Sequence, residues 1–213
     1  MPTLTKQRRI FEKKCNTLLR SAAKGSGWKK ASNFVFYSDS RFFFQATLSV
    51  YLNANRTLAR FSAKPMLIDP ILWDILGIPE NTSGPMSLRG NGAFSCSTPD
   101  FYEAEIETPD STSNTIVDSF INFAKTSKDQ FLDEYANISF SQLISKDPNH
   151  IERGAYAITL VASLINEANY QLALDIALGH SSGKLTSCLQ FSSKGQSFHD
   201  LAVTWLNARK TQC

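Results

Sequence analysis

The chain has 213 residues, of which 42% are hydrophobic and 19% are charged, so it can bury a core and is not an intrinsically disordered chain. Its net charge of +3 is unevenly distributed: residues 1–64 hold thirteen Lys and Arg against two acids, whereas residues 65–213 hold nine against seventeen. Because charge distribution bears on partners rather than on fold, we expect surfaces of opposite sign that bind other molecules.

The sequence also indicates where the chain acts. Its first residues lack the apolar run of a secretory signal, and its longest largely apolar stretch, residues 155–165, is shorter than the roughly 20 residues that span a bilayer. The four cysteines, Cys15, Cys96, Cys188 and Cys213, show no CxxC spacing. We therefore expect a cytoplasmic protein with free thiols and no membrane partner.

An amphipathic helix is expected at the N-terminus, because apolar and basic residues alternate with helical spacing over residues 4–24. The glycines at 25 and 27 are expected to end it. The apolar positions are Leu4, Phe11, Cys15, Leu18 and Ala22.

Antiparallel strands are expected next. Residues 33–37 and 41–52 are rich in β-formers and flank a Ser-Asp-Ser turn, and residues 57–63 can return beside them. Residues 41–52 alternate apolar and polar, which is typical of a strand with one wet face. Phe43 and Tyr51 interrupt the polar face, so we expect another segment to cover part of it.

A short buried helix and a second strand pair follow. Asp69 is expected to cap the helix, Pro70 to occupy its first turn and Gly77 to close it. Residues 77–92 are rich in glycine and proline and predict a loop. We expect strands over residues 93–96 and 101–107, with alternate glutamates on one face of the second.

Helical periodicity dominates from residue 111 onward. We expect a long helix after the Ser/Thr cluster at 111–115, a short helix near 141–145, a hairpin of helices over 152–165 and 170–178, and a last helix over 198–209. The predicted fold class is therefore α+β, with an N-terminal helix, a mainly antiparallel β-sheet and a C-terminal helical part. A single domain is expected over residues 1–213, with 1–110 and 111–213 as its alternative subdivision.

An acidic run without a base is the first candidate partner-binding site. Carboxylates at alternate strand positions form a ridge rather than a converging set, so they do not predict a metal site. Such a ridge is typical of a solvated strand face, or of a docking surface for a basic partner. Its residues are Asp100, Glu103, Glu105, Glu107 and Asp110.

A basic stripe on the N-terminal helix is the alternative site. It is typical of a solvated helix face, and it also fits non-specific nucleic-acid binding, because Trp28 and several phenylalanines follow it. No zinc finger, helix-turn-helix or RNP signature accompanies it. Its residues are Lys6, Arg9, Lys13, Arg20, Lys24, Lys29 and Lys30.

No motif predicts catalysis, a metal or a cofactor. His150, His180 and His199 are isolated and lack the HxH, HxxxH or HExxH spacing of metal sites. The chain has no GxSxG nucleophile elbow. We expect a protein that is not an enzyme and needs no cofactor, with a Cys–His pair assembled in space as the alternative that sequence leaves open.

The most distinctive stretches are residues 64–77, KPMLIDPILWDILG, and residues 87–94, SLRGNGAF. Here the chain resembles small bacterial immunity proteins found beside polymorphic toxins, including those of contact-dependent growth inhibition systems. The resemblance extends mainly over residues 25–107. It implies a cytosolic antitoxin that binds and neutralises a cognate toxin domain, often a nuclease. Because the acidic run contains no base, we expect it to pair with the basic residues that hold the toxin's substrate.

Overall fold

The α+β fold is confirmed in a computed structural model. Its contacts divide the chain into two compact units. Unit 1 comprises Met1–Ala63 and Asp100–Ala136, and unit 2 comprises Lys64–Pro99 and Asn137–Cys213, so the chain enters each unit twice. The described residues are 3–51, 56–90, 94–107, 112–186, 191–193 and 195–210.

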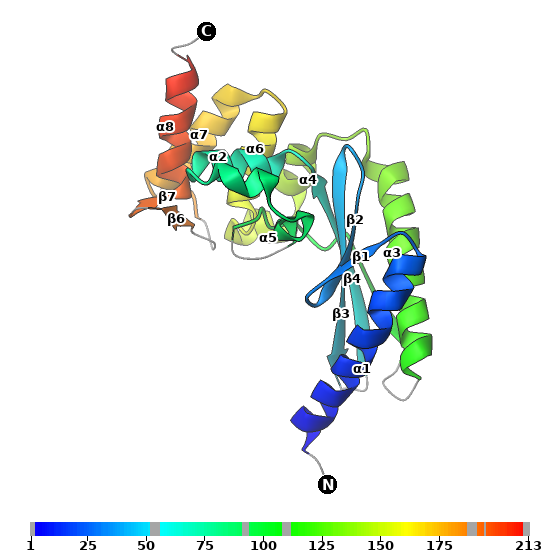
Figure 1. The fold of residues 1–213 in the computed structure, drawn as a ribbon. Helices are drawn as coiled ribbons and strands as arrows, with labels where there is room; N and C mark the ends of the chain where they lie inside the picture. The colour runs from blue at the N-terminus through cyan, green and yellow to red at the C-terminus, as the bar shows by residue number, and fades with distance from the viewer. Residues whose placement is uncertain are drawn as a thin grey trace. The chain divides into compact units, whose positions relative to one another are not determined.

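Unit 1 begins with α1 (Leu4–Gly25), which confirms the predicted N-terminal helix. Its buried line is Cys15, Leu19 and Ala23, at four-residue intervals that place the three side chains on one face. This line packs beside α3 (Ser113–Tyr135), as Figure 1 shows. The predicted apolar face is rotated slightly around the helix axis from the buried one. Phe11, which belongs to the predicted face, is partly exposed.

The sheet of unit 1 has five strands in sequence order. Strand β1 pairs with β2, β2 with β3 and β4 with β5 in antiparallel fashion. Short turns join β1 to β2 and β2 to β3, as is usual for antiparallel neighbours, whereas the long segment that enters unit 2 separates β4 from β5. The bounds are β1 Lys29–Ala31, β2 Phe34–Ser38, β3 Phe42–Tyr51, β4 Arg56–Pro65 and β5 Tyr102–Glu107.

The polar face of β3 is covered along the first half of the strand, in agreement with the interruption at Phe43. Phe43 is 1% exposed and Gln45 is 5% exposed, so both faces are buried there. Phe43 stacks on Phe36 of β2 with ring centroids 5.5 Å apart. The phenylalanine that interrupts the polar pattern thus belongs to a second apolar surface, and the strand becomes exposed at Tyr51.

Helix α3 covers the other face of the sheet. Its Thr112 cap accepts a hydrogen bond from the Thr115 N–H, so the predicted helix begins within the Ser/Thr cluster at 111–115 rather than after it. Phe131 is fully buried and meets Phe42 and Phe44 edge to face at 5.5 and 6.0 Å. This aromatic cluster fixes β3 and α3 together as the core of unit 1.

Unit 2 is built around α6 (Ala157–Asn166). Residues 157–165 are all buried, because α2, α4 and α7 pack around this helix. An almost wholly apolar sequence is what such a central helix requires. The surrounding helices are α2 Ile68–Ile75, α4 Phe140–Lys146, α5 Pro148–Arg153, α7 Tyr170–Ser181 and α8 Phe198–Lys210.

The C-terminal helices differ from their predictions in two places. The helix expected over 152–165 is interrupted at Gly154, whose φ of 62° ends α5 and favours glycine, and α6 begins after it. Asp147, with Pro148 following, caps α5, which the sequence reading missed. A two-stranded hairpin, β6 (Ser192–Ser193) with β7 (Gln196–Ser197), precedes α8.

The start of α2 is also different. Asp69 lies within the first turn instead of capping it, and the cap position is Leu67. The Asp69 carboxylate is instead buried, 2.9 Å from Lys64 Nζ, and it accepts the Cys96 N–H at 2.8 Å. Arg89 lies 3.9 Å from the same carboxylate and donates to the Met66 carbonyl at 2.7 Å.

This ion network explains the distinctive sequence stretches. The stretch of residues 64–77 supplies the Lys–Asp pair and the stretch of 87–94 supplies Arg89. The loop between them contains two short 3₁₀ turns, η2 (Pro79–Ser83) and η3 (Met86–Arg89). The strand predicted over 93–96 is wrong for its described residues 94–96, because Cys96 bonds to Asp69 rather than to a neighbouring strand.

Candidate partner-binding surfaces

The acidic run lies on and beside the edge strand of the unit 1 sheet. Glu103 and Glu105 project from β5 to one face, and their side chains are 47% and 48% exposed. Asp100 precedes the strand and is also exposed. Asp110, the fifth predicted member, lies outside the described residues. The structure therefore brings three of the predicted acids together on an accessible surface.

Two arginines of β4 lie directly beside these acids. Arg60 Nε is 2.5 Å from Glu103 Oε2 and 3.6 Å from Asp100 Oδ2, and Arg56 Nε is 2.9 Å from Glu105 Oε2. The sequence showed an acidic run without a base because the bases come from a strand more than forty residues earlier. We call these five side chains the charge ladder: Arg56, Arg60, Asp100, Glu103 and Glu105.

Glu107 does not belong to the charge ladder. Its carboxylate accepts a hydrogen bond from Ser119 Oγ of α3 at 3.1 Å. The register between β4 and β5 shifts at Thr57 and Leu58, immediately beside it. Such an irregularity re-aims side chains, so the even alternation expected for residues 103, 105 and 107 fails at its end.

Each arginine of the ladder has a carboxylate partner. A hydrogen bond with Tyr51 and the Glu103 carboxylate raise the pKa of Arg60, so its charge is constant. Burial raises the pKa of Asp100, and Arg60 opposes that shift. Ion pairs this exposed contribute only about 0–1 kcal/mol each to folding. Their main effect is to orient a two-sign pattern of charges at the surface.

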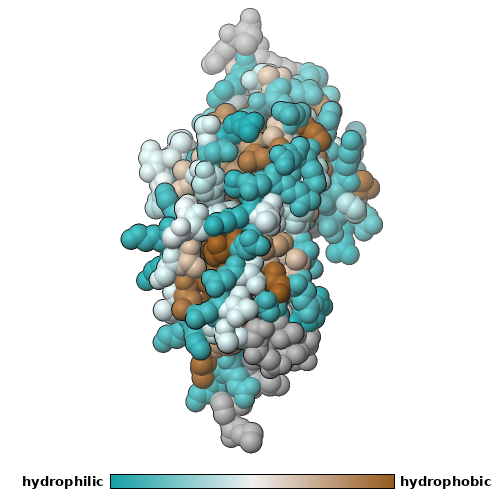
Figure 2. Space-filling model, turned by 90° about the vertical axis from the view of Figure 1, so that its right-hand side faces the viewer, coloured by the Kyte–Doolittle hydropathy of each residue, from teal (hydrophilic) through white to brown (hydrophobic). Residues whose placement is uncertain are grey.

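The predicted basic stripe lies on the exposed side of α1. Lys6, Arg9, Lys13, Arg20 and Lys24 are all exposed along it. Over residues 3–31 nine basic residues accompany a single acid, Glu12, whose carboxylate pairs with Arg8 at 2.7 Å. Figure 2, which views the molecule from the side of α1 and α3, shows a mainly hydrophilic surface with small, separate apolar patches.

Lys29 and Lys30 lie on β1 rather than on the helix. Lys29 is exposed, whereas Lys30 is partly buried and donates to the Ser32 carbonyl. Burial lowers the pKa of Lys30, with Arg20 adding to the shift. The stripe therefore comprises the five helical cations and Lys29. The Lys30 side chain does not belong to it, because it is bonded to the backbone of the turn that follows β1.

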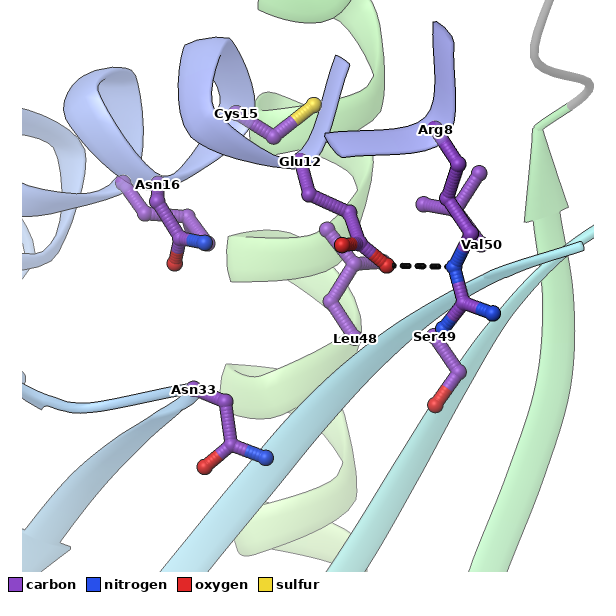
Figure 3. A pocket seen from close by; sticks show the side chains of 9 residues that line it. Arg8, Glu12, Cys15, Asn16, Asn33, Leu48, Ser49 and Val50 are labelled. Atoms are coloured by element: carbon purple, nitrogen blue, oxygen red, sulfur yellow. Dashed lines mark hydrogen bonds and ion pairs between the residues drawn. The ribbon is translucent and has the colours of Figure 1, made fainter. Parts of the chain in front are cut away.

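A shallow hollow of about 290 Å³ lies between α1 and β3. The Arg8–Glu12 pair and Asn16 border it from the helix, and Asn33 and Ser49 border it from the sheet side (Figure 3). Cys15 of α1 also borders the hollow but points its sulfur away from it (Figure 3), and burial raises the pKa of this thiol. The hollow thus offers amide and hydroxyl groups beside the basic stripe and no activated nucleophile.

The three histidines, isolated in the sequence, lie in unit 2 on α5, α7 and α8. His180 and His199 stack with ring centroids 4.4 Å apart. Parallel rings cannot both direct a nitrogen lone pair at one metal ion, because ligation occurs in the ring plane. In the described part of the chain, no three His, Cys, Asp or Glu side chains are arranged to hold a metal. The stacking of His180 on His199 could not be predicted from the spacing of residues along the sequence.

The described helices include none with the length and apolar character needed to cross a membrane.

Comparison with known proteins gives no family assignment. No protein-family model, no curated protein and no solved structure matches the chain.

Proposed function

We propose that this chain is an immunity protein that acts in the cytoplasm, without catalysis, by binding a cognate toxin domain through protein contact. The observation that supports it best is the charge ladder with the adjoining Tyr51. The neighbouring strands β4 and β5 carry two arginines, each bound by a carboxylate, next to a tyrosine that is 37% exposed.

This composition suits a protein partner. Arginine and tyrosine are enriched at protein interfaces, and they dominate binding energy when their positions are fixed in advance. Glu103 and Arg60 already hold each other, so the partner needs to order neither side chain. Lower ordering cost is a general source of affinity. The sequence resemblance to immunity proteins points to the same class of partner.

The two-sign pattern changes the expected mode of recognition. A purely acidic ridge would attract a basic toxin surface over long range, whereas the ladder has three acids against two bases and a net charge of −1. Its contribution to long-range attraction is therefore small. Complementary placement of opposite charges gives specificity and fixes register, so we expect a toxin surface with bases opposite the glutamates and an acid near an arginine.

The proposal is tested first by capture and growth protection. The tagged full chain is used to capture partners from host lysate, with nuclease treatment as control, and the captured protein is identified by mass spectrometry. Its gene is then expressed with and without this chain. The proposal predicts growth arrest that co-expression relieves. A captured protein that does not arrest growth, or an arrest that co-expression leaves unchanged, contradicts it.

A matched pair of variants tests the role of the ladder. Arg60→Glu alone places like charges side by side, whereas Arg60→Glu with Glu103→Arg restores an ion pair in the opposite direction. Both variants should weaken protection, because both change the pattern that the partner meets. If the double variant protects as well as the wild type, the charge ladder is not the contact surface.

A second candidate function is nucleic-acid binding through the basic stripe. The specific observation is that nine basic residues accompany one acid over residues 3–31, and only Arg8 pairs with it. The five helical cations follow one side of α1 over eighteen residues, about 27 Å of helix.

Salt dependence separates this function from the first. Binding to a duplex should weaken with salt, with log affinity falling by about 0.9 per phosphate contact against log salt concentration. Replacing Lys13, Arg20 and Lys24 by glutamine should flatten that slope. The same changes at Lys125, Lys128 and Lys146 serve as the charge-matched control. Absent or salt-insensitive binding to duplex DNA and RNA rules this function out.

A further inference from the structure

The contact between α7 and α8 contains two stacked imidazoles. His180 lies in the last turn of α7 and His199 is the second residue of α8. Their ring centroids are 4.4 Å apart and their planes are inclined by 20°. Phe198 meets the His199 ring edge to face at 5.3 Å. His199 is therefore enclosed by one imidazole and one phenyl ring, and it is only 4% exposed.

Neither ring pairs with an acid in the described part of the chain. Both nitrogens of His199 and Nδ1 of His180 are buried without a hydrogen-bond partner among the described residues. The nearest carboxylate, Asp200, accepts hydrogen bonds from Ser181 Oγ and from Ser197 Oγ at 2.6 Å. Asp200 is therefore oriented toward two serines, and its charge only partly favours an imidazolium at His199.

Other charged groups around the pair lie farther out. On the α5 side, His150 and Glu152 line a hollow of about 440 Å³ together with Lys184, and His180 borders it. From α2, Asp74 faces α8 and is bound by Trp205 and by Arg209 of that helix. Asp69 of α2 pairs with Lys64. Helix α6 and the described residues of β6 and β7 carry no titratable side chain.

We propose that the stacked His180–His199 pair is a pH-sensitive contact that holds α7 against α8 while both rings are neutral. Protonation of either ring places a charge against the other imidazole, and the Asp200 carboxylate, which favours the charged form of His199, offsets only part of that cost. Acidification should therefore weaken unit 2, to which all these groups belong.

The direction of the effect follows from linkage. Burial lowers the pKa of both rings, and for His199 burial, with His180 adding to it, lowers the pKa to about 4. In the unfolded chain the pKa returns to about 6.5. The stabilising effect is thus fully present above pH 6.5, declines as the pH falls, and is lost near pH 4. For His199 alone, the unfolding constant should rise about thirtyfold between pH 7.5 and pH 5.0.

Two measurements on the full chain test this proposal. In the folded protein, the His199 Hε1 resonance should stay at its neutral position through pH 6.5 and titrate only below about pH 5. Urea unfolding at pH 7.5 and 5.0 is then compared for the wild type, His199→Gln and His150→Gln. The pH dependence should fall sharply in His199→Gln and fall less in His150→Gln, which leaves the stacked pair in place although burial also lowers the pKa of His150.

Either of two results would overturn the proposal. One is a His199 resonance that titrates near pH 6.5 in the folded protein. The other is a His199→Gln variant that keeps the pH dependence of the wild type. If His199→Gln does not fold, the titration of the wild type decides alone, because it requires no substitution.

Discussion

Lys64 Nζ lies 2.9 Å from the Asp69 carboxylate in the interior of unit 2, where the two side chains are 2% and 1% exposed. The lysine also donates to the Cys96 carbonyl at 2.9 Å, so it joins the end of β4, the first turn of α2 and the segment after the 3₁₀ turns. Removing one partner of such a pair leaves a buried charge uncompensated.

Replacing Lys64 by methionine should therefore lower the free energy of unfolding by about 3–5 kcal/mol. The double variant Lys64→Met with Asp69→Leu should recover part of that loss, because it removes both charges of the pair while Arg89 stays beside the site. Urea denaturation of the two variants measures this. Equal losses in the single and double variants would mean that packing at these sites, rather than charge pairing, determines the cost.

Phe131 is the side chain on which the core of unit 1 depends most. It is fully buried and its ring meets Phe101 at 4.9 Å, as well as Phe42 and Phe44 of β3. Phe131→Ala should cost about 3–5 kcal/mol of stability, from lost transfer energy and the remaining cavity. Phe123→Ala, on the same helix but only partly buried, is the control. If thermal unfolding shows a similar loss of stability for both variants, this role of Phe131 is contradicted.

The cap of α3 gives a smaller, local prediction. Thr112 Oγ1 accepts the Thr115 N–H at 3.2 Å and satisfies one of the free donors in the first turn. Thr112→Ala should destabilise the fold by about 1 kcal/mol, whereas Thr112→Ser should retain most of the stability, because serine caps equally well. Chemical denaturation of both variants provides the comparison. Identical unfolding midpoints for Thr112→Ala and Thr112→Ser would exclude a capping role.

Cys96 should resist alkylation in the folded chain. Its thiol is 0% exposed, and burial raises its pKa well above the usual value, with the nearby Asp69 adding to the shift. Since the thiolate is the reactive form, iodoacetamide at pH 8 should leave Cys96 unmodified until the chain is unfolded. Peptide mass spectrometry of native and urea-treated samples measures this. Rapid labelling in the native sample would contradict the buried placement.

Elements with a clear local signal could be predicted from the sequence. The spacing of apolar residues identified α1 and α3, and turn residues between apolar runs identified β2, β3 and β4. Where a local sequence signal conflicted with tertiary packing, the packing determined the conformation of the residue. Asp69 has the sequence of a helix cap, yet its carboxylate is used by Lys64 and Cys96, which lie on either side of it in the chain.

The candidate surfaces were only half predictable for the same reason. Exposure of the α1 cations follows from the helical pattern alone. The pairing of Glu103 with Arg60, and the stacking of His180 on His199, depend on which strands and helices become neighbours. No spacing rule reports such contacts, because the paired residues are 43 and 19 positions apart.

The charge ladder is the surface that we propose contacts a toxin domain. The most direct measurement is the dissociation constant of the captured toxin for the wild type and for Arg60→Glu with Glu103→Arg, at fixed salt, with circular dichroism showing that the fold is kept. The proposal predicts affinity at least tenfold weaker in the variant, a loss of about 1.4 kcal/mol. An unchanged dissociation constant in a folded variant would contradict it and leave the basic stripe of α1 as the surface to examine.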